Sequence, residues 1–277
     1  MVNSTTAIMA YTGALPGGRA APNLSAVPVL ADPNLTFFFT LAFANDADGT
    51  GNFQPQWDPN ITPDVIAQLK QSNGSIQFKA SLGGDANYAP WPAPSDQDGW
   101  VNNATASLFK LMDSYGLDGF DIDYEGGSDG APLDDSFVQC MSRVINNIGS
   151  QTNQASTIAP FGQTAAAYQA LYEQSSTWIA LVNYQAYADD IPDAQGYLTL
   201  YDNLARQWNV GYETLGLGIA SSNGQADDTR GLQPPDIYTV WDALHSQGTI
   251  CAAIWDLEDS QLCDPPFAIE SAIQLRS

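Results

Sequence analysis

Short apolar runs alternate with helical patterns along this chain of 277 residues, and this alternation constrains the possible folds more than any other feature. Eight runs rich in β-branched and aromatic residues are predicted strands, at Ala7–Tyr11, Leu35–Phe43, Ser75–Ser81, Gly119–Tyr124, Thr157–Pro160, Ile179–Tyr187, Glu213–Ala220 and Ile250–Trp255. Helical patterns separate most of them, at Pro63–Gln71, Gln97–Tyr115, Asp135–Ile148, Thr164–Glu173, Leu198–Gln207, Pro235–Ser246 and Ile269–Leu275. Repeated strand–helix units build a parallel sheet, and eight of them close into a barrel of about 250 residues. We therefore predict an α/β fold, a single (β/α)8 TIM barrel that spans residues 1–277.

The composition excludes several classes of partner. The formal net charge is −23, which repels nucleic acid and anionic membranes and argues against an acidic polymer as substrate. The sequence has no apolar stretch of about 18 residues or more, so we expect no membrane span. A neutral polymer remains open as a substrate, and we expect a monomer.

Cysteine and histidine are too few for a zinc site of the Cys/His type. The three cysteines, Cys140, Cys251 and Cys263, form no Cys-x-x-Cys pair. Cys251 and Cys263 could form a disulfide near the C-terminus, which would leave Cys140 free. The single histidine, His245, is expected to be a solvated residue in the last turn of a helix, so a Ser/His or Cys/His nucleophile has no support. We expect no metal and no cofactor.

The start of the chain and its glycosylation sequons favour a secreted protein. No basic segment followed by an apolar one precedes the first predicted strand, so the chain is either intracellular or a mature form without its signal peptide. Six Asn-x-Ser/Thr sequons occur, at Asn3, Asn23, Asn34, Asn60, Asn73 and Asn103. Chance could produce some of them, but beside only eight Lys and Arg residues they favour the secreted, glycosylated form.

The fourth predicted strand carries a ladder of acids, in the sequence Leu117-Asp118-Gly119-Phe120-Asp121-Ile122-Asp123-Tyr124-Glu125. Side chains alternate between the two faces of a strand, so Asp121, Asp123 and Glu125 share one face. The other face is apolar and should pack outward against helices, which directs the acids into the barrel, with Glu125 at its mouth. Carboxyls roughly 6–7 Å apart along a buried strand cannot all stay ionised, so their pKa values should separate and one acid should stay protonated.

A calcium loop is the main alternative for this run of acids. The twelfth position from Asp121 is Pro132 instead of the glutamate that such a loop needs, and the residues between the acids are typical of a strand. A solvated strand face is a weaker alternative, because a central barrel strand has none. Catalytic groups in such barrels lie at the C-terminal ends of strands, so this ladder is the candidate active site.

The run from Asp118 to Glu125 matches the DGxDxDxE signature of glycoside hydrolase family 18, and the chain resembles this family along essentially its whole length. Ser81-Leu82-Gly83-Gly84 matches the SxGG at the end of strand three of the family, and Trp255 matches its tryptophan at the end of strand eight. The greatest similarity is to plant-type class III chitinases such as hevamine and to their relatives concanavalin B and narbonin, at Tyr11-Thr12-Gly13, Ala42-Phe43-Ala44 and Val182-Asn183-Tyr184-Gln185-Ala186-Tyr187. The acidic motif is highly specific, whereas SxGG or one tryptophan would be weak alone.

The resemblance implies an endo-acting chitinase that hydrolyses β-1,4-linked N-acetylglucosamine polymers with retention of configuration. Glu125 would protonate the glycosidic oxygen, and the 2-acetamido oxygen of the substrate would attack C1 and form an oxazolinium ion. Asp123 would hydrogen-bond the acetamido N–H. Asp121 would lie deeper, hold Asp123 and share a proton with it, and Asp118 would fix the entrance of the strand.

A phenol on the sixth strand is implied as the partner of the acetamido oxygen. Alternation favours one inward set of Asn183, Gln185 and Tyr187, so Tyr187 is our candidate, and Tyr184 takes its place if the register differs. Trp255 would form the apolar floor under the sugar.

Further candidates for substrate contact lie at or after the first three strands. Aromatic residues that could stack on sugars are Tyr11, Phe43, Trp57 and Trp91. For Trp57 and Trp91, core packing is an equal alternative. Ser81, Gly83 and Gly84 are better explained by close backbone packing, although Gly83 stays among the candidates for substrate contact.

Two other functions remain open on the same barrel. An endo-β-N-acetylglucosaminidase uses the same acid motif on the chitobiose core of N-glycans, and the loops decide between the two substrates. A chitin-binding lectin or storage protein would be a catalytically silent barrel. The intact Asp121, Asp123, Glu125 and Tyr187 argue against the silent form, although an occluded groove could still abolish activity.

Overall fold

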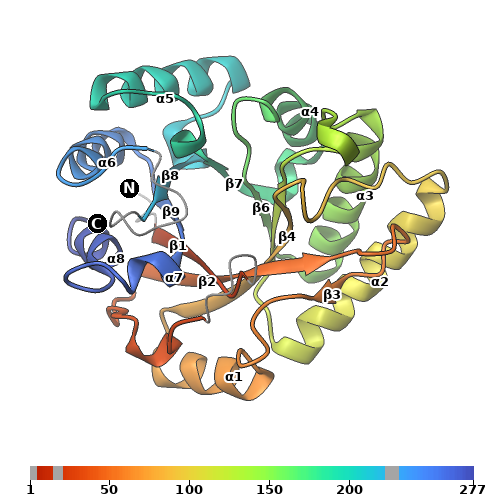
Figure 1. The fold of residues 1–277 in the computed structure, drawn as a ribbon, viewed down its shortest axis with the longest axis horizontal. Coiled ribbons are helices and arrows are strands. Elements are labelled where there is room, and N and C mark those ends of the chain that lie inside the picture. Colours follow the sequence, from red (N-terminus) through yellow and green to blue (C-terminus); the bar gives the residue numbers. More distant parts are fainter. Residues whose placement is uncertain (1–4, 15–20, 222–230) are drawn as a thin grey trace.

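A computed structural model describes residues 5–14, 21–221 and 231–277, and its main strands form a closed barrel (Figure 1). The barrel strands are β1 (Thr6–Thr12), β2 (Leu35–Asn45), β4 (Ile76–Gly84), β5 (Phe120–Tyr124), β6 (Ser156–Ile158), β7 (Ile179–Tyr184), β8 (Leu215–Ala220) and β9 (Cys251–Trp255). They pair in parallel in the order β1-β9-β8-β7-β6-β5-β4-β2, and β2 pairs with β1 to close the ring. The fold is therefore a (β/α)8 barrel, as the sequence predicts.

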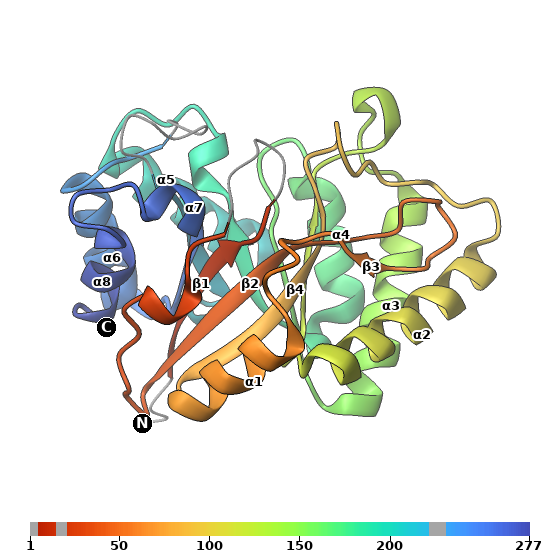
Figure 2. The ribbon, with the colours of Figure 1, turned by 60° about the horizontal axis from the view of Figure 1, so that its bottom comes forward.

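Helices form a ring around the barrel, and Figure 2 shows α1 and α2 from the side. The helices are α1 (Pro63–Ser72), α2 (Gln97–Tyr115), α3 (Asp135–Thr152), α4 (Ala165–Ser175), α5 (Ala194–Trp208), α6 (Asp236–Gln247), α7 (Leu257–Ser260) and α8 (Ala268–Gln274). Local chemistry sets their boundaries: the side chains of Thr62 and Asp96 accept hydrogen bonds from the N–H groups of Val65 and Gly99 at the starts of α1 and α2. Gly116 ends α2 in the left-handed conformation, so this helix has the predicted boundaries.

The structure differs from the predicted elements at several places, besides shifts of a few residues at the ends of other strands and helices. The short strand β3 (Gln54–Pro55) pairs antiparallel with the end of β2, and α7 follows β9 directly. The predicted strand Ile179–Tyr187 ends at Tyr184, because the chain turns into a 3-10 helix at Ala186–Ala188. The other 3-10 helices are Leu24–Ala26, Ser128–Gly130, Ser176–Trp178 and Tyr212–Thr214.

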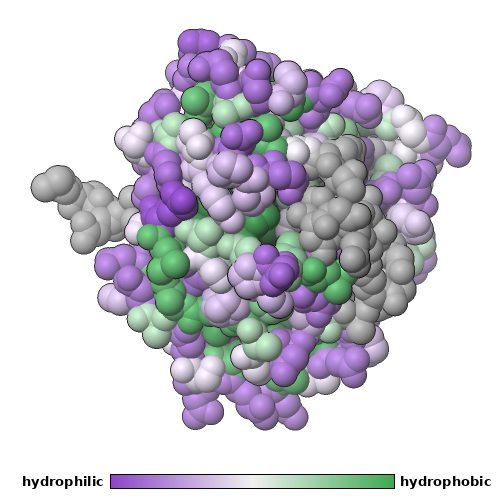
Figure 3. All heavy atoms as spheres, turned by 60° about the vertical axis from the view of Figure 1, so that its left-hand side comes forward, coloured by the Kyte–Doolittle hydropathy of each residue, from purple (hydrophilic) through white to green (hydrophobic). Residues whose placement is uncertain are grey.

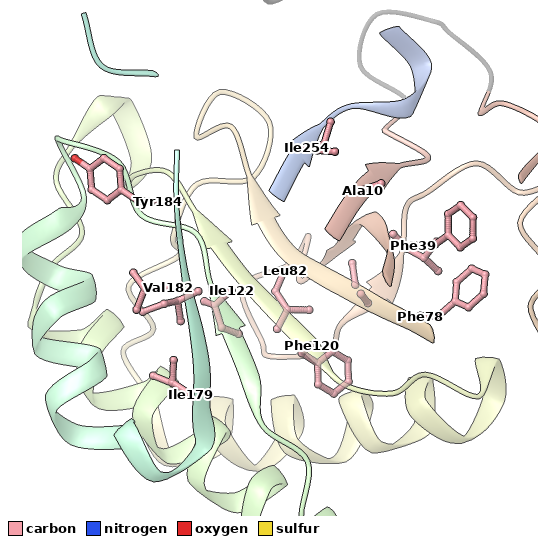
Figure 4. Close-up of a cluster of buried hydrophobic side chains, with 14 of the residues drawn as sticks. Ala10, Phe39, Phe78, Leu82, Phe120, Ile122, Ile179, Val182, Tyr184 and Ile254 are labelled. Atoms are coloured by element: carbon pink, nitrogen blue, oxygen red, sulfur yellow. The ribbon is translucent and has the colours of Figure 1, made fainter. Parts of the chain in front are cut away.

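The barrel wall separates two apolar layers. Outward side chains of the strands pack against the helices, and Figure 4 displays part of this outer core, where the rings of Phe39 and Phe78 stack 5.2 Å apart. Phe120 and Ile122 of β5 belong to it, so the acidic face of β5 points into the barrel. The inner cluster is much smaller and consists of Ala7, Met9, Tyr11, Leu181, Cys251 and Ala253. Fully burying one large apolar side chain contributes about 1.5–3 kcal/mol, so most of the hydrophobic stabilisation lies outside the barrel.

The cysteines and the histidine do not lie as expected. All three cysteines are free thiols, so Cys251 and Cys263 form no disulfide. Cys251 begins β9 and is fully buried in the inner cluster, whereas Cys263 follows α7, beyond the other end of that strand. His245 is half-buried instead of solvated, because its ring stacks on Trp241 and its Nδ1 lies 2.8 Å from the carbonyl oxygen of Thr249.

Two buried carboxyls form hydrogen bonds in the C-terminal segment, one to the end of β1 and one within the segment itself. Glu258 of α7 is 2 % exposed, and its Oε1 accepts hydrogen bonds from the N–H of Gly13 at 2.5 Å and from the hydroxyl of Thr12 at 3.2 Å. Glu270 of α8 is fully buried, and the hydroxyl of Ser260 donates to its Oε2 at 2.6 Å. Burial removes the hydration of the carboxylates, which raises the pKa of Glu258 to about 8 and the pKa of Glu270 to about 7.

The surface is mixed in polarity and carries most of the sequons. On the face displayed in Figure 3, hydrophobic side chains form separate groups between hydrophilic ones. The exposed sequon asparagines are Asn23, Asn34, Asn60 and Asn103. Asn73 is half-buried and uses its side chain to bind the carbonyl oxygen of Val29 and the N–H of Ser75, and Asn3 lies outside the described residues. Within the described ranges, no helix has both the length and the apolar character needed to cross a membrane.

Candidate active site

The acid ladder rises through the barrel interior on β5. Asp121 is fully buried, and its carboxylate accepts hydrogen bonds from the hydroxyls of Tyr11 at 2.9 Å, Ser81 at 2.8 Å and Thr157 at 2.6 Å. These donors lie on β1, β4 and β6, so closure of the barrel surrounds the carboxylate with hydroxyl groups. Burial raises the pKa of Asp121, but the three donors oppose this rise because they stabilise the ionised form.

Asp123 lies one step closer to the mouth and faces a small pocket. The lining residues of this pocket are Tyr11, Asp123, Asn183, Gln185, Tyr187, Gly218, Ala253 and Trp255. The side-chain nitrogen of Gln185 donates to Asp123 Oδ1 and to the carbonyl oxygen of Ala159, both at 2.8 Å. Because a carbonyl oxygen can only accept, this pair of contacts fixes the orientation of the amide, and Asp123 Oδ1 must accept as well.

Charge repulsion and burial affect the pKa values of Asp121 and Asp123 to different degrees. The pKa of Asp123 is well above its ordinary value, because burial desolvates its carboxylate and the carboxyls of Glu125 and Asp121 repel its charge. Asp121 has three hydroxyl donors that stabilise its charge, whereas the neighbouring carboxyls oppose a charge on Asp123, so a proton shared by this pair is favoured on Asp123. No group of three or more His, Cys, Asp or Glu side chains within the described ranges is arranged to hold a metal ion.

Glu125 follows the last residue of β5 and is half-buried at the rim. Its N–H donates to the carbonyl oxygen of Gly84 at 3.4 Å, which ties the top of the ladder to β4. Gly83 and Gly84 have φ of +101° and +97°, and added Cβ atoms would lie 2.9 Å from the rings of Tyr124 and Phe43 respectively. These glycines thus allow the close packing that the sequence predicts beside Glu125. Gly83 is not among the residues that line this pocket, so its contact with substrate stays a prediction.

Asp118 lies at the other end of this strand, before β5 begins. Its carboxylate pairs with the ammonium of Lys70 at 2.8 Å and accepts a hydrogen bond from the N–H of Phe78 at 2.8 Å. Asp118 therefore fixes the entrance of the strand, as predicted, far from the mouth of the barrel.

Three aromatic rings stand together at the ends of β1, β2 and β9. Trp255 lines the pocket, and the centre of its ring lies 5.8 Å from that of Tyr11, with the planes tilted by 58°. Phe43 stacks on Trp255 at 5.9 Å and 25° but is not among the lining residues. Trp255 and Tyr11 can therefore meet a sugar directly, and Phe43 supports Trp255.

The chain turns after Tyr184, and this turn brings Tyr187 into the pocket. The hydroxyl of Tyr187 donates to Gln185 Oε1 at 3.1 Å, so the two side chains extend the hydrogen-bonded chain that begins at the acid ladder. The ring of Tyr184 lies in the outer core instead (Figure 4). Its hydroxyl donates to Asp189 at 2.8 Å. Asn183, Gln185 and Tyr187 line the same pocket, as predicted. Strand alternation does not explain this beyond Tyr184, where a turn directs the side chains into the pocket.

Trp91 and Trp57 lie in the outer core. Trp91 is 2 % exposed, its ring packs edge-on against Trp100 at 5.0 Å, and its indole N–H donates to the hydroxyl of Ser136. No face of the ring is open, so the structure places Trp91 in the core, which is the alternative given for it beside sugar stacking. Trp57 is 4 % exposed and packs edge-on against Tyr115 at 5.1 Å, which is core packing as well.

Three residues around the site were not among the candidates. Thr157 donates to the lowest acid of the ladder, and Gly218 and Ala253 line the pocket. A Cβ on Gly218 would lie 2.2 Å from the carbonyl oxygen of Tyr184, so only glycine lets β8 lie this close to the end of β7. In the sequence of β8, Gly216 and Gly218 alternate with Leu215 and Leu217. This alternation indicated a strand whose inward face carries no side chains at these positions.

A (β/α)8 barrel with buried carboxyls stacked toward an aromatic pocket at its mouth is the architecture of a glycoside hydrolase. Comparisons with known proteins identify the family. Chitinase 1 of Tulipa saxatilis subsp. bakeri is 30% identical over 264 residues, which are 90% of this chain and 81% of the relative. The crystal structure of the catalytic domain of a family GH18 chitinase from the fern Peteris ryukyuensis superposes with a TM-score of 0.84 at 28% identity and covers 98% of both chains. The chain belongs to glycoside hydrolase family 18, and it is a chitinase-type glycoside hydrolase.

Two further similarities are relevant to its substrate. Residues 82–212 match the family described as the TIM-barrel domain of the endo-beta-N-acetylglucosaminidase EndoS. The RuBisCO-associated protein of Glycine max is 27% identical over 238 residues, which are 79% of this chain and 82% of that relative. The second relative is named for an association instead of a hydrolytic activity.

Proposed function

We propose that this protein is an endo-acting chitinase that hydrolyses β-1,4-linked N-acetylglucosamine polymers with retention of configuration. Glu125 protonates the glycosidic oxygen, and the substrate's own acetamido oxygen attacks C1 to form an oxazolinium ion, which water then opens. As the acetamido nitrogen becomes positive, Asp123 hydrogen-bonds its N–H and stabilises the charge, and Asp121 lies deeper and shares a proton with Asp123. The hydroxyl of Tyr187 donates to the attacking oxygen, and Trp255 forms the floor under the sugar.

The environment of Asp123 carries this proposal. Gln185 donates to its Oδ1 at 2.8 Å, and its pKa is well above the ordinary value, which favours the protonated form of the carboxyl that faces the pocket. A neutral carboxyl is a poor nucleophile toward C1, but it can exchange a proton and hydrogen bonds with an amide. Asp123 is also the one carboxyl that lines the pocket among the residues that the structure describes.

Proton NMR of the first products from chitin oligomers tests the mechanism. Two displacements at C1 retain the configuration, so the initial product should be the β-anomer. Cellohexaose and fully deacetylated chitosan lack the carbonyl that attacks, so both should remain uncut, and a thiazoline mimic of the oxazolinium ion should inhibit. An initial α-anomer, or efficient cleavage of cellohexaose, would contradict substrate assistance.

The endo action is tested by the sizes of early products. An endo-acting enzyme cuts a chitin hexamer at internal bonds, so tetramer, trimer and dimer should appear together in the first minutes. Stepwise release of one small unit from one end would contradict this part of the proposal and leave the chemistry intact.

A second candidate function is that of an endo-β-N-acetylglucosaminidase on the chitobiose core of N-glycans. The match of residues 82–212 to the EndoS barrel family favours it. Incubation with N-acetylglucosamine oligomers and with a high-mannose glycopeptide, side by side, decides between the two substrates. Binding of oligomers without cleavage of either would instead indicate a catalytically silent lectin, a possibility that the RuBisCO-associated relative keeps open.

We also propose that the protein is secreted and acts as a glycosylated monomer with one catalytic domain. The exposure of Asn23, Asn34, Asn60 and Asn103 supports this, because these side chains are open to a glycosyltransferase. Peptide mass spectrometry after expression in a eukaryotic secretory pathway should find glycans on some of these four asparagines. Light scattering should give the monomer mass.

A further inference from the structure

Lys79 is a cation inside the barrel, beneath the acid ladder. It lies on β4, two residues before Ser81, and is 4 % exposed. Because β4 and β5 pair in parallel with Ser81 opposite Asp121, Lys79 lies one layer deeper than Asp121 on the same inward face. Gly119, directly before the neighbouring strand β5, leaves room for the Lys79 side chain, since an added Cβ at this position would lie 3.0 Å from Lys79 Nζ. The interior of this barrel therefore contains a positive charge directly below its acids.

The immediate contacts of Lys79 do not satisfy an ammonium group. Its Nζ donates to the carbonyl oxygen of Ala155 at 3.3 Å and lies 5.1 Å from the centre of the Phe38 ring. An ammonium has three N–H donors, and a buried charge is costly unless a negative charge compensates it. The compensating charge must therefore come from a carboxylate near this layer.

Three acidic groups face Lys79 from the elements around it: the carboxyls of Asp121 and Asp118 and the thiol of Cys251. Asp118 is already neutralised by Lys70, whose ammonium lies 2.8 Å from it. Burial raises the pKa of Cys251 far above neutral pH, so its thiol stays uncharged. Asp121 remains, and its three hydroxyl donors stabilise its ionised form against the effect of burial.

We propose that Lys79 is a positioning residue of the acid ladder, whose charge keeps Asp121 ionised from below and so leaves the proton of the acid pair on Asp123. The proposal rests on the proposed function, because it specifies which carboxyl of that mechanism carries the proton. The two charges act across one layer of the barrel, and Tyr11, Ser81 and Thr157 fill the polar contacts of Asp121 itself.

The pKa values of the two groups agree with this coupling. Burial lowers the pKa of Lys79 to about 8, and the negative charge of Asp121 is the largest opposing influence. Reciprocally, the charge of Lys79 lowers the pKa of Asp121 against the effect of burial. Lys79 thus keeps its charge at neutral pH and loses it in mildly alkaline solution.

A titration of lysine nitrogen by NMR tests the coupling without any measurement of hydrolysis. The chain has three lysines, Lys70, Lys79 and Lys110, so a protein labelled with 15N-lysine gives three Nζ signals, and Lys79→Met assigns the buried one. In Asp121→Asn the pKa of Lys79 should fall by about 1 unit or more, because the attraction that stabilises its charge is gone. An unchanged pKa of Lys79 would overturn the proposal.

The pH profile of hydrolysis tests the consequence for the reaction. In Lys79→Met the acid pair takes up its second proton at higher pH, so the acidic limb of kcat/KM should move up by about 1 pH unit with little change in KM. Lys110→Met removes an exposed charge of α2 and should keep the wild-type profile. Lys79→Gln keeps a hydrogen-bond donor without the charge, so it should behave as Lys79→Met; a wild-type profile in Lys79→Gln would mean that the charge is irrelevant.

Melting curves identify variants that do not fold, and in that case the NMR titration of Asp121→Asn decides. If the wild-type protein cleaves neither chitin oligomers nor glycopeptide, the proposed function is refuted. The coupling between Lys79 and Asp121 would still be accepted or rejected by the Nζ titration.

Discussion

Glu270→Gln should make the stability of this fold less dependent on pH. Glu270 is fully buried, its Oε2 accepts a hydrogen bond from Ser260, and its Oε1 has no hydrogen-bond partner within the described structure. Burial raises the pKa of Glu270 from 4.5 to about 7. The folded protein therefore keeps a proton that the unfolded chain has released, so this stabilisation is complete below pH 4.5 and is lost as the pH rises through 7.

The magnitude follows from the shift in pKa. A rise from 4.5 to about 7 is 2.5 units, which at about 1.36 kcal/mol per unit corresponds to about 3.4 kcal/mol of unfolding free energy. About 0.8 kcal/mol of this is already lost at pH 5, so about 2.5 kcal/mol is lost between pH 5 and pH 8. With an unfolding entropy of about 2.1 cal/mol/K per residue, 277 residues give about 0.58 kcal/mol/K, so the change in Tm is about 4 °C.

Thermal melting by circular dichroism at pH 5 and pH 8 measures this effect. The Tm of Glu270→Gln minus that of the wild type should rise by about 4 °C from pH 5 to pH 8. The titration of Glu258 is common to both proteins and cancels in the difference. Glu173→Gln, an exposed change on α4, is the matched control and should give the same difference at both pH values. If the difference for Glu270→Gln is also constant, Glu270 is ionised in the native state and the reasoning is refuted.

Three substitutions test the site itself. Glu125→Gln should abolish hydrolysis and retain oligosaccharide binding by calorimetry; more than a few per cent of activity would exclude Glu125 as the proton donor. Tyr187→Phe should lower kcat on the order of 100-fold, because it removes a donor to a developing charge, and Tyr184→Phe should lower it much less; the opposite ranking would mean that the other phenol acts. Gly218→Ala should destabilise the fold by about 1–3 kcal/mol and lower kcat at least roughly tenfold, because its Cβ would lie 2.2 Å from a backbone oxygen of β7. Gly74→Ala, where nothing lies within 4 Å of the added Cβ, is its control, and equal effects of the two would contradict the steric argument.

The elements of this fold could be predicted where local chemistry alone determines them. The boundaries of α2 follow from Asp96 before it and Gly116 after it, and both act through neighbours in sequence. The face of β5 that carries the acids follows from alternation, because Phe120 and Ile122 need the outer core. In each of these cases the sequence contains the cause within a few residues.

The site was less predictable wherever distant segments decide. Trp91 follows a strand end, as a sugar-binding residue would, yet the loop folds back and buries it against Trp100. Strand β7 ends at Tyr184, but the strand-like sequence continues to Tyr187, so this end could not be predicted from the sequence. The need for glycine at position 218 of β8 is clear only from its contact with β7, a strand that lies more distant in sequence but pairs with β8 in the sheet. These residues depend on tertiary contacts, which periodicity does not report.

The pairing of β1 with β9 has a consequence for how the molecule is completed on the ribosome. β1 can pair with β2 early, but its other edge stays open until the last strand has been synthesised. The ring centres of Tyr11 and Trp255 are 5.8 Å apart in the finished pocket. Tyr11 leaves the ribosome early in synthesis, and Trp255 leaves it late. Until then the interior of the barrel is open along this edge. The burial that is the largest cause of the raised pKa of Asp123 is therefore complete only when the final strand closes the barrel.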